Sequence, residues 1–394
     1  MIYKIQASHS IHTSINLPAS KSISNRALIL NALAKSSYPV ENRSDSDDTR
    51  VLFNALQSSG PDFDIGAAGT SMRFLTAYLS QLEGNWTITG SERMKNRPIG
   101  ILVDALRSIG AEIEYEDKEG FPPLHIRGKK LKGGKITLNG GVSSQYISAL
   151  MMIAPCLKQG LKICLEGNII SKPYIQMTKG LMEIFGVNVF WEGQNIEIEP
   201  QDYIPVPFQV ESDWSAASYW YEIQALAPDA SVELLGLEEN SLQGDAKIET
   251  VMADLLRLPM NTVFQYDFTN EPDLAQTLVV TCCLLNIPFR FTGLQSLRIK
   301  ETDRMTALQT ELRKLGYIIQ SESNSILEWT GKKGEPEPHP VIATYEDHRM
   351  AMAFAPVCLK TREIRIANPE VVSKSYPRFW LDLAQAGFII TEEP

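Results

Sequence analysis

The side chains most suited to chemistry in this sequence are basic residues at the starts of expected helices. Residues 17–34 contain apolar positions at helical spacing, and Lys21, Ser22 and Arg26 lie within about one turn of the expected start. The amide groups at a helix N-terminus carry about half a positive charge, so these cations and hydroxyls would together form an anion-binding site. For this stretch alone, a capped surface helix with solvated Lys and Arg is the alternative.

The same arrangement recurs along the chain. One set of expected helices mostly starts with a cation, sometimes followed by Pro, and ends at a Gly; it covers 47–60, 97–110, 172–186, 247–259, 300–316 and 374–387. A second set begins near Ser20, Thr70, Ser143, Asp213, Asp273 and His348. Alternating apolar strands follow several helices, as at 111–116 and 187–192. The sequence therefore predicts an α/β fold of six similar units, three per domain, with helices buried inside a shell of sheets. The first unit is short, because 58–70 leaves room for little hairpin.

The composition narrows the class of protein. A chain of 394 residues is expected to form about two domains. The net charge of −10 argues against nucleic acid as a partner, and the apolar runs are too short to cross a membrane. The N-terminal segment lacks the features of a signal or transit peptide, so we expect a cytoplasmic protein. Five cysteines without CxxC spacing indicate neither a metal site nor a disulfide framework.

Cations at equivalent places in a repeat suggest one shared ligand. For each of them alone, a solvated surface charge is the alternative. If the helix starts face one interdomain cleft, however, their charges converge on a ligand with several negative charges, such as a phosphate. Hydroxyl and amide groups accompany them. The cations are Lys21, Arg26, Arg73, Arg97, Lys172, Lys300, Arg304, Arg349 and Lys374, and the polar groups are Gly69-Thr70, Ser143-Ser144-Gln145 and Ser171.

Two carboxylates and a histidine stand among these cations. In a cation-rich pocket, Asp273 or Glu301 would orient a substrate hydroxyl or carry a proton. The alternative is a carboxylate that only stabilises the helix dipole. His348, between Asp347 and Arg349, is either a capping residue or part of the site.

Seven strings of residues carry a resemblance to a known family. In order they are LPASKSISNRAL, GTSMRFL, RMKNRPIG, SSQYISALM, ISKPYI, LRIKETDR and DHRMAMAF. With them, essentially the whole chain resembles the 5-enolpyruvylshikimate-3-phosphate synthase (EPSP synthase) family, the 3-phosphoshikimate 1-carboxyvinyltransferases. The resemblance implies two lobes, each of three βαβαββ units arranged as an inside-out α/β barrel. It places the first lobe at 1–18 plus 212–394, the second at 19–211, and the active site in the cleft between them.

The resemblance also implies an activity and the residues that serve it. The family transfers the enolpyruvyl group of phosphoenolpyruvate to the 5-hydroxyl of shikimate 3-phosphate by addition and elimination of phosphate, in chorismate and aromatic amino acid biosynthesis. It requires no metal and no cofactor. The implied catalytic residues are Lys21, Asp273, Glu301 and His348. Shikimate 3-phosphate would contact Lys21, Ser22, Arg26, Ser143, Ser144, Gln145, Ser171, Tyr174, Asp273 and Lys300, and phosphoenolpyruvate would contact Lys21, Gly69, Arg97, Gln145, Arg304, Arg349 and Lys374.

Three features depart from the family's pattern. Ala67 stands where an Asn usually precedes the Ala-Gly-Thr string, and Ser296 stands where an Asn often precedes the KETDR string. One phosphoenolpyruvate contact and one phosphate contact of the family are therefore in question here. The shortened first unit is the third departure.

Two other functions are compatible with this architecture. UDP-N-acetylglucosamine enolpyruvyl transferases resemble this chain in architecture, but they start with a Lys-Asn pair and usually carry a Cys in an Arg-flanked loop. Here Ser22 follows Lys21, and the loop near RMKNRPIG has no Cys. A non-catalytic binding protein of the same fold is the second alternative, and the presence of Lys21, Asp273, Glu301 and Arg349 argues against it. We expect a monomer with small-molecule substrates.

Overall fold

Two units of α/β structure make up the chain, in a computed structural model that describes residues 1–7 and 10–393. The first unit consists of Met1–Pro18 and Ser212–Pro394, and the second of Ala19–Glu211. The first unit is discontinuous in sequence, because the second is inserted after its first two strands. No helix of the described residues is long and apolar enough to cross a bilayer.

The first unit combines short strands with helices of up to thirteen residues. Its strands are β1 (Ile2–Gln6), β2 (His12–Asn16), β13 (Ser231–Leu235), β14 (Phe264–Asp267), β15 (Phe289–Thr292), β16 (Gln320–Glu322), β17 (Ile326–Trp329), β18 (Val341–Ile342), β19 (Glu363–Ala367) and β20 (Ile389–Glu393). Its α-helices are α8 (Trp214–Leu226), α9 (Ile248–Leu256), α10 (Ala275–Leu285), α11 (Arg304–Lys314), α12 (His348–Phe354), α13 (Cys358–Thr361) and α14 (Phe379–Gln385). Short 3₁₀ helices are η2 (Gly244–Lys247), η3 (Pro272–Leu274), η4 (Gln295–Ile299), η5 (Ala355–Val357) and η6 (Pro369–Lys374).

The second unit is built from the same kinds of element. Its strands are β3 (Val40–Glu41), β4 (Asp62–Asp64), β5 (Gly84–Thr89), β6 (Glu112–Tyr115), β7 (Leu124–Gly128), β8 (Gly134–Asn139), β9 (Leu161–Glu166), β10 (Phe190–Glu192), β11 (Asn195–Ile198) and β12 (Phe208–Gln209). Its helices are α1 (Lys21–Leu33), α2 (Asp47–Gln57), α3 (Gly69–Gln81), α4 (Glu92–Lys95), α5 (Gly100–Ser108), α6 (Ser144–Ile153), η1 (Ala154–Cys156) and α7 (Lys172–Ile184).

The sheets repeat one βαβαββ plan. Each unit contains two four-stranded sheets, with orders β4-β5-β7-β6 and β8-β9-β11-β10 in the second unit and β14-β15-β17-β16 and β18-β19-β1-β20 in the first. In all four the first two strands are parallel and the other neighbours are antiparallel. The N-terminal strand β1 completes the last sheet. A third copy in each unit is reduced to a parallel pair, β12-β3 or β13-β2.

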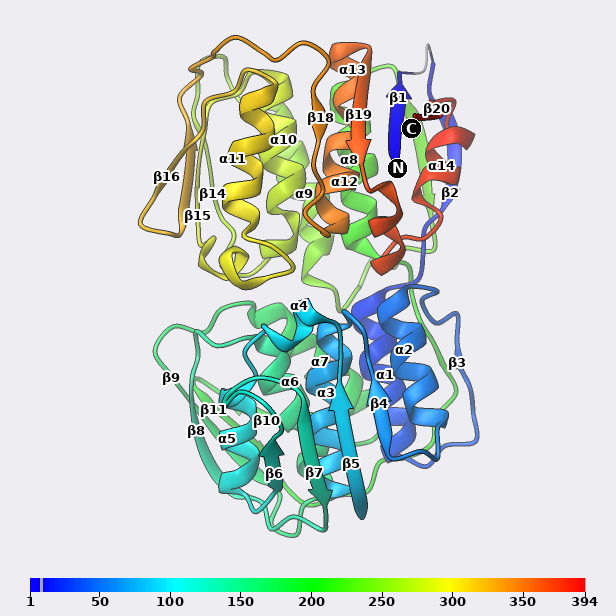
Figure 1. The fold of residues 1–394 in the computed structure, drawn as a ribbon, viewed down its shortest axis with the longest axis vertical. Helices are drawn as coiled ribbons and strands as arrows, with labels where there is room; N and C mark the ends of the chain where they lie inside the picture. Colours follow the sequence, from blue (N-terminus) through cyan, green and yellow to red (C-terminus); the bar gives the residue numbers. More distant parts are fainter. Residues whose placement is uncertain (8–9, 394) are drawn as a thin grey trace. The chain divides into compact units, whose positions relative to one another are not determined.

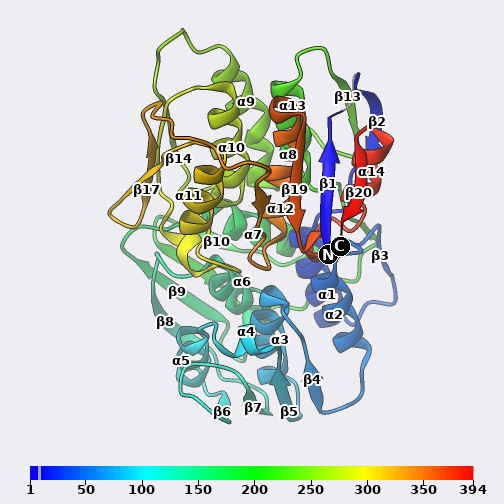
Figure 2. The same cartoon turned by 45° about the horizontal axis from the view of Figure 1, so that its top comes forward.

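Each unit has three inner helices that pack against one another. These are α1, α3 and α6 in the second unit and α8, α10 and α12 in the first. In α10 and α12 nearly every residue is buried, whereas the outer helix α2 buries only Asp48, Thr49 and Leu52. A helix that is apolar on all sides must be surrounded by protein. Figure 1 and Figure 2 show α8, α10 and α12 between the sheet that contains β14 and the sheet that contains β1 and β19. The predicted α/β class, with helices inside sheets, is confirmed.

The inner helices start close to where the sequence predicts. Ser20, Ser143 and Asp213 are the N-cap residues of α1, α6 and α8, and each side chain accepts a hydrogen bond from a backbone N–H of the first turn. Such caps satisfy amide groups that have no partner inside the helix. The expected 300–316 and 374–387 helices differ from the prediction, because α11 begins only at Arg304 and α14 only at Phe379. Lys300 and Glu301 therefore lie in the segment between η4 and α11.

Glu222 on the inner helix α8 gives a first prediction. Its carboxyl group is fully buried, and burial raises its pKa well above the ordinary value for Glu. The folded protein therefore holds a proton that the unfolded chain releases above about pH 4.3. Stability is then lost as pH rises from that value toward the raised pKa, by up to about 1.4 kcal/mol per pH unit. Glu222→Gln keeps the shape without the proton, so we expect it to remove this loss.

Denaturant unfolding at pH 5.5 and 7.5 measures the effect of Glu222→Gln. The variant should gain free energy of unfolding relative to the original chain at the higher pH. Glu238→Gln, in an exposed loop, is the control and should change nothing. An equal difference between variant and original chain at both pH values would contradict a buried neutral carboxyl group.

Candidate functional site

Arg304 is the centre of a charged cluster in the first unit. It is buried at the first position of α11 and contacts three carboxylates from three different segments. Its Nε donates to Asp347 Oδ2 at 2.7 Å, Nη1 to Asp273 Oδ1 at 2.9 Å, and Nη2 to Glu301 Oε2 at 2.9 Å. Burial alone would lower the pKa of Arg304, but the charges of the three carboxylates outweigh it and raise the pKa. The guanidinium therefore stays charged and holds Asp273 and Glu301 in one place.

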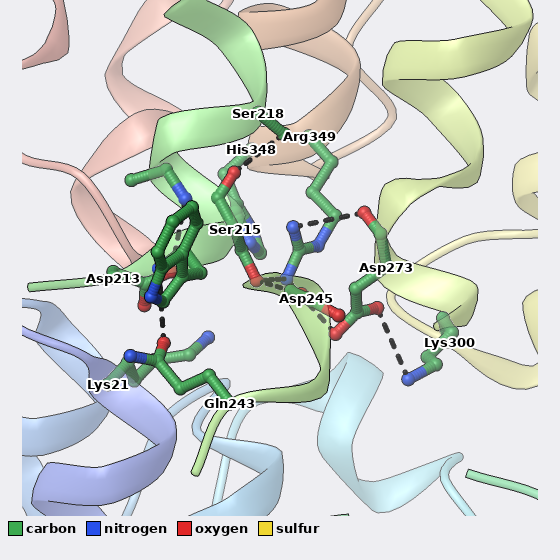
Figure 3. A network of polar contacts seen from close by, with 12 residues as sticks. Lys21, Asp213, Ser215, Ser218, Gln243, Asp245, Asp273, Lys300, His348 and Arg349 are labelled. Carbon is green, nitrogen blue, oxygen red and sulfur yellow. Dashed lines mark hydrogen bonds and ion pairs between the residues drawn. The ribbon is translucent and has the colours of Figure 1, made fainter. Parts of the chain in front are cut away.

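Asp273 is shared by two further cations. Arg349 Nη2 lies 3.0 Å from Asp273 Oδ2, and Lys300 Nζ lies 3.5 Å from Oδ1. Figure 3 shows the Arg349 and Lys300 side chains on opposite sides of this carboxylate. Asp273 lies in η3, whose Pro272 and short 3₁₀ turn lead into the inner helix α10. The structure thus brings together four predicted site residues of this unit around Arg304: Asp273, Lys300, Glu301 and Arg349.

The start of α12 supplies His348 and Arg349. Asp347 caps this helix by accepting from Arg349 N at 2.9 Å, and it also accepts from Arg304. The two residues before it, Tyr345 and Glu346, have positive φ angles of 53° and 56°. That conformation is uncommon for side chains other than Gly and requires support. Lys374 Nζ supports it by donating to Glu346 O at 2.9 Å.

Lys21 and Asp48 form an ion pair in the second unit. Their Nζ and Oδ2 atoms are 3.4 Å apart, and both side chains are largely buried. Lys21 is the first residue of α1 and Asp48 the second of α2, so two helix starts meet here. The chemistry that the position offers is a charged amine beside a carboxylate.

The Arg26 side chain is more deeply buried than binding a ligand at the protein surface would require. It is buried, and its donors contact Thr178 Oγ1 at 2.7 Å, Ser22 O at 2.9 Å and Ser148 Oγ at 3.2 Å. Tyr174 O is 3.4 Å away, and the Tyr174 ring lies 5.9 Å from the guanidinium carbon. Burial lowers the pKa of Arg26 to about 10, so the side chain remains charged near neutral pH. Arg26 therefore joins α1, α6 and α7 as well as adding charge.

Gly69 and Arg97 lie against each other at the start of α3. A methyl group on Gly69 would be 2.4 Å from Arg97 Nη1, so only Gly permits this approach. Arg73 braces the pair by donating to Gly69 O and Pro98 O at 3.0 Å each. Gln145 joins α6 to this helix start by donating to Thr70 Oγ1 at 3.1 Å.

Two further helix starts carry the predicted serines. Ser143 caps α6, and Ser144 is its buried first residue. Ser171 precedes α7 in the left-handed conformation, with φ of 52°, and Tyr174 lies in the first turn of that helix. In this unit the predicted hydroxyls thus lie at the N-termini of inner or adjoining helices, where the backbone also attracts anions.

Sequence reasoning did not assign a role to several groups that support these clusters. Asp48 and Asp347 were visible only as acidic residues near helix starts. Ser148 and Thr178 carried no signal at all, because their partner Arg26 is more than 100 residues away in sequence. A charged donor with three buried polar partners can be recognised only after the chain has folded.

The fold, the charged cluster around Arg304 and the polar helix starts of the second unit define the class of this protein. It is a two-domain α/β protein whose cations, hydroxyls and carboxylates suit anionic small molecules and proton transfer. Among residues 1–7 and 10–393, no group of three or more His, Cys, Asp or Glu residues could hold a metal ion. Comparison with known proteins agrees with this class. The family model described as EPSP synthase (3-phosphoshikimate 1-carboxyvinyltransferase) matches residues 5–63 and 59–383. The chain belongs to the EPSP synthase family.

Individual relatives and structures support the assignment. The chain is 56% identical to a 3-phosphoshikimate 1-carboxyvinyltransferase of Bacteroides fragilis (strain ATCC 25285), with 98% of each chain covered. It is 37% identical to the protein of the same name from Photobacterium damsela subsp. piscicida, with 97% of this chain and 98% of the relative covered. The EPSP synthase structure from Acinetobacter baumannii superposes with a TM-score of 0.79 at 21% identity, covering 99% of this chain and all of the other. At this level of sequence identity, the structural similarity shows the fold alone.

Proposed function

We propose that this chain transfers the carboxyvinyl group of phosphoenolpyruvate to the 5-hydroxyl of shikimate 3-phosphate and releases phosphate, as a 3-phosphoshikimate 1-carboxyvinyltransferase. The arrangement of Asp273 and Glu301 on one buried guanidinium, Arg304, carries the proposal. It holds two carboxylates at fixed positions among cations, as a reaction with two anionic substrates and two proton transfers requires. Family membership makes this the favoured activity over UDP-N-acetylglucosamine enolpyruvyl transfer.

We assign the residues to the substrates as the family resemblance implies. Shikimate 3-phosphate contacts the hydroxyls and amide at the starts of α6 and α7, together with Ser22, Arg26, Tyr174 and Lys300. Phosphoenolpyruvate contacts Gly69, Arg97, Gln145, Arg304, Arg349 and Lys374. Lys21 contacts both substrates, Asp273 contacts shikimate 3-phosphate, and Glu301 and His348 lie near the reacting carbon. The helix starts and cations then neutralise the charge of two phosphates and two carboxylates.

The reaction needs a base near the 5-hydroxyl and an acid near C3 of phosphoenolpyruvate. In our proposal Asp273 or Lys21 accepts the hydroxyl proton while C2 is attacked. Glu301 or Lys21 donates a proton to C3, which gives a tetrahedral intermediate with a methyl group. Loss of phosphate and of one C3 proton then forms the enolpyruvyl product. The cations stabilise the charge of the departing phosphate.

A phosphate-release assay with both substrates tests this function. Phosphate should appear only when shikimate 3-phosphate and phosphoenolpyruvate are both present. UDP-N-acetylglucosamine in place of shikimate 3-phosphate should give none. The absence of phosphate with either acceptor would instead favour a non-catalytic binding protein. We further propose that the chain acts as a monomer in the cytoplasm, and light scattering of the active protein checks the monomer.

Gly69→Ala is expected to raise the KM for phosphoenolpyruvate by about 10-fold or more while sparing shikimate 3-phosphate. The new methyl group would meet the flexible end of Arg97, which must move away. Loss of one charge-assisted contact corresponds to about 1.5–3 kcal/mol. Steady-state kinetics measures both KM values. Gly60→Ala, whose methyl group would meet only Ser58 Oγ at 3.5 Å, is the control; equal losses for both substrates would contradict this role of Arg97.

A further inference from the structure

The amide side chain of Gln243 links the start of α8 to the 3₁₀ turn η2 in the first unit. Gln243 Oε1 accepts from Trp214 N at 3.1 Å, and its Nε2 donates to Ser212 O at 2.8 Å. Gln243 is buried, so both bonds are protected from water. This connection fixes Asp245, two residues further on, beside the first turn of α8.

Asp245 contacts that turn through Ser215. The carboxyl group is buried, and its Oδ2 accepts a hydrogen bond from Ser215 Oγ. Figure 3 shows Asp245 beside Ser215 and on the same side of Arg349 as the carboxylate of Asp273. Neither Asp245 nor Ser215 belongs to the residues that the family resemblance assigns to the substrates.

The Ser215 hydroxyl group links Asp245 to Arg349. Arg349 Nη2 lies 3.5 Å from Ser215 Oγ, and Nη1 lies 3.4 Å from the hydroxyl of Tyr219, one turn further along α8. A serine hydroxyl has one proton to donate and two lone pairs that accept. When the proton points to Asp245, a lone pair remains for the guanidinium, which only donates.

We propose that Asp245 is a positioning residue for Arg349. It accepts the hydrogen bond of the Ser215 hydroxyl group and so directs a lone pair of the Ser215 oxygen to the Arg349 guanidinium. With Ser215 and Tyr219 on one side and Asp273 on the other, Arg349 is held between α8 and η3. Asp273 O accepts from Nη1 at 3.2 Å and completes this frame. The consequence for catalysis rests on the proposed function, in which Arg349 binds phosphoenolpyruvate.

The protonation of Asp245 adds a pH dependence to this geometry. The groups that face it are Asp273 from η3, Arg349 from α12, Asp213 and Ser215 at the start of α8, and Tyr266 from β14. Burial and then the charge of Asp273 raise the pKa of Asp245 to about 7, against the opposing effects of Arg349 and the Ser215 hydrogen bond. A protonated Asp245 keeps an acceptor oxygen but gains an O–H that can donate to Ser215, so the Ser215 proton is held toward it less firmly and can turn toward Arg349. The frame around Arg349 therefore loosens as pH falls through about 7.

The test compares four variants: Ser215→Ala, Asp245→Ala, the double variant of these two, and Asp245→Asn. Each alanine variant should raise the KM for phosphoenolpyruvate by about 10-fold, as for a lost charge-assisted contact, and leave the KM for shikimate 3-phosphate within twofold. The double variant should be no worse than either single one, because both break the same link. Asp245→Asn keeps a neutral acceptor oxygen, as a protonated Asp245 does, so it should restore part of the phosphoenolpyruvate KM and flatten its dependence on pH between 6 and 8.

Three outcomes would overturn the proposal. They are an unchanged phosphoenolpyruvate KM in Asp245→Ala, effects of the two alanine variants that multiply in the double variant, and equal losses for both substrates. Glu249→Gln, an exposed carboxylate on the neighbouring α9, is the matched control and should behave as the original chain. If the original chain shows no turnover, the proposed function fails, but the positioning role is still decided by crystal structures of Ser215→Ala and Asp245→Ala. An Arg349 guanidinium in its original place in both would contradict it.

Discussion

Arg304→Met is expected to lower the free energy of unfolding by about 3–5 kcal/mol and to abolish measurable turnover. Removing one partner of a buried ion pair leaves the other charge buried without compensation, and such changes typically cost this much. Here the guanidinium is buried and serves three carboxylates, of which Asp347 is itself fully buried. Without the cation, Asp273 and Glu301 repel each other and lose their common anchor.

Arg304→Lys keeps the positive charge but loses the planar guanidinium, so it separates the effect of the charge from the effect of the hydrogen-bond geometry. A lysine ammonium is a compact charge and cannot reach three carboxylates with the fixed fork of a guanidinium. We expect it to recover part of the stability and little of the turnover. Denaturant unfolding and the phosphate-release assay measure the two quantities. Arg290→Met is the matched control, because Arg290 also pairs with two carboxylates, Glu322 and Glu328, but at the surface.

The control should lose far less stability than Arg304→Met, since exposed ion pairs are screened by solvent. Equal losses in the two methionine variants would show that burial is not what makes the Arg304 cluster important. Full turnover in Arg304→Lys would show that the fork geometry is not needed to place Asp273 and Glu301.

The sequence allowed the repeated plan and the helix starts to be predicted because both depend on local chemistry. Ser20, Ser143 and Asp213 are cap residues that act on amides three residues or fewer away. The start of α11 could not be placed as well. Asp303 caps it by accepting from Thr306 N at 3.1 Å, and this cap competed with the cation-based pattern that pointed to Lys300.

The partners of the site residues were harder to predict than the residues themselves. Motifs in sequence identified Asp273 and Arg349, but 76 positions separate them, and their 3.0 Å contact depends on how η3 and α12 pack. Asp245 gave no signal, because a single Asp in a polar stretch resembles a solvated side chain. Its burial beside Ser215 follows from the hydrogen bonds of the Gln243 side chain to the start of α8, which are tertiary contacts.

Glu301→Gln is expected to slow turnover by about 10²-fold or more while shikimate 3-phosphate still binds. A positioned acid or base typically contributes about 10²–10⁴-fold to the rate. The amide keeps an oxygen that accepts from Arg304 Nη2, now 2.9 Å from the carboxylate, so the fold of this segment should survive. Calorimetry measures binding and the phosphate-release assay measures turnover. Asp303→Asn is the control: it removes a neighbouring charge but keeps a good helix cap, so its turnover should stay close to that of the original chain.

Turnover in deuterium oxide connects this residue to the reaction path. If the intermediate carries a methyl group, one of its protons comes from a side chain that exchanges with solvent. Rotation of the methyl group then lets either a solvent-derived or an original proton leave, so deuterium should appear in the enolpyruvyl methylene of the product.

Direct attack with cleavage of the phosphorus-oxygen bond never protonates C3. Mass spectrometry of the product therefore separates the two paths, and an unlabelled methylene would rule out addition and elimination. Slower turnover with an unchanged labelled fraction in Glu301→Gln would show that the remaining turnover still passes through the same methyl intermediate, so that Glu301 changes the rate and not the path.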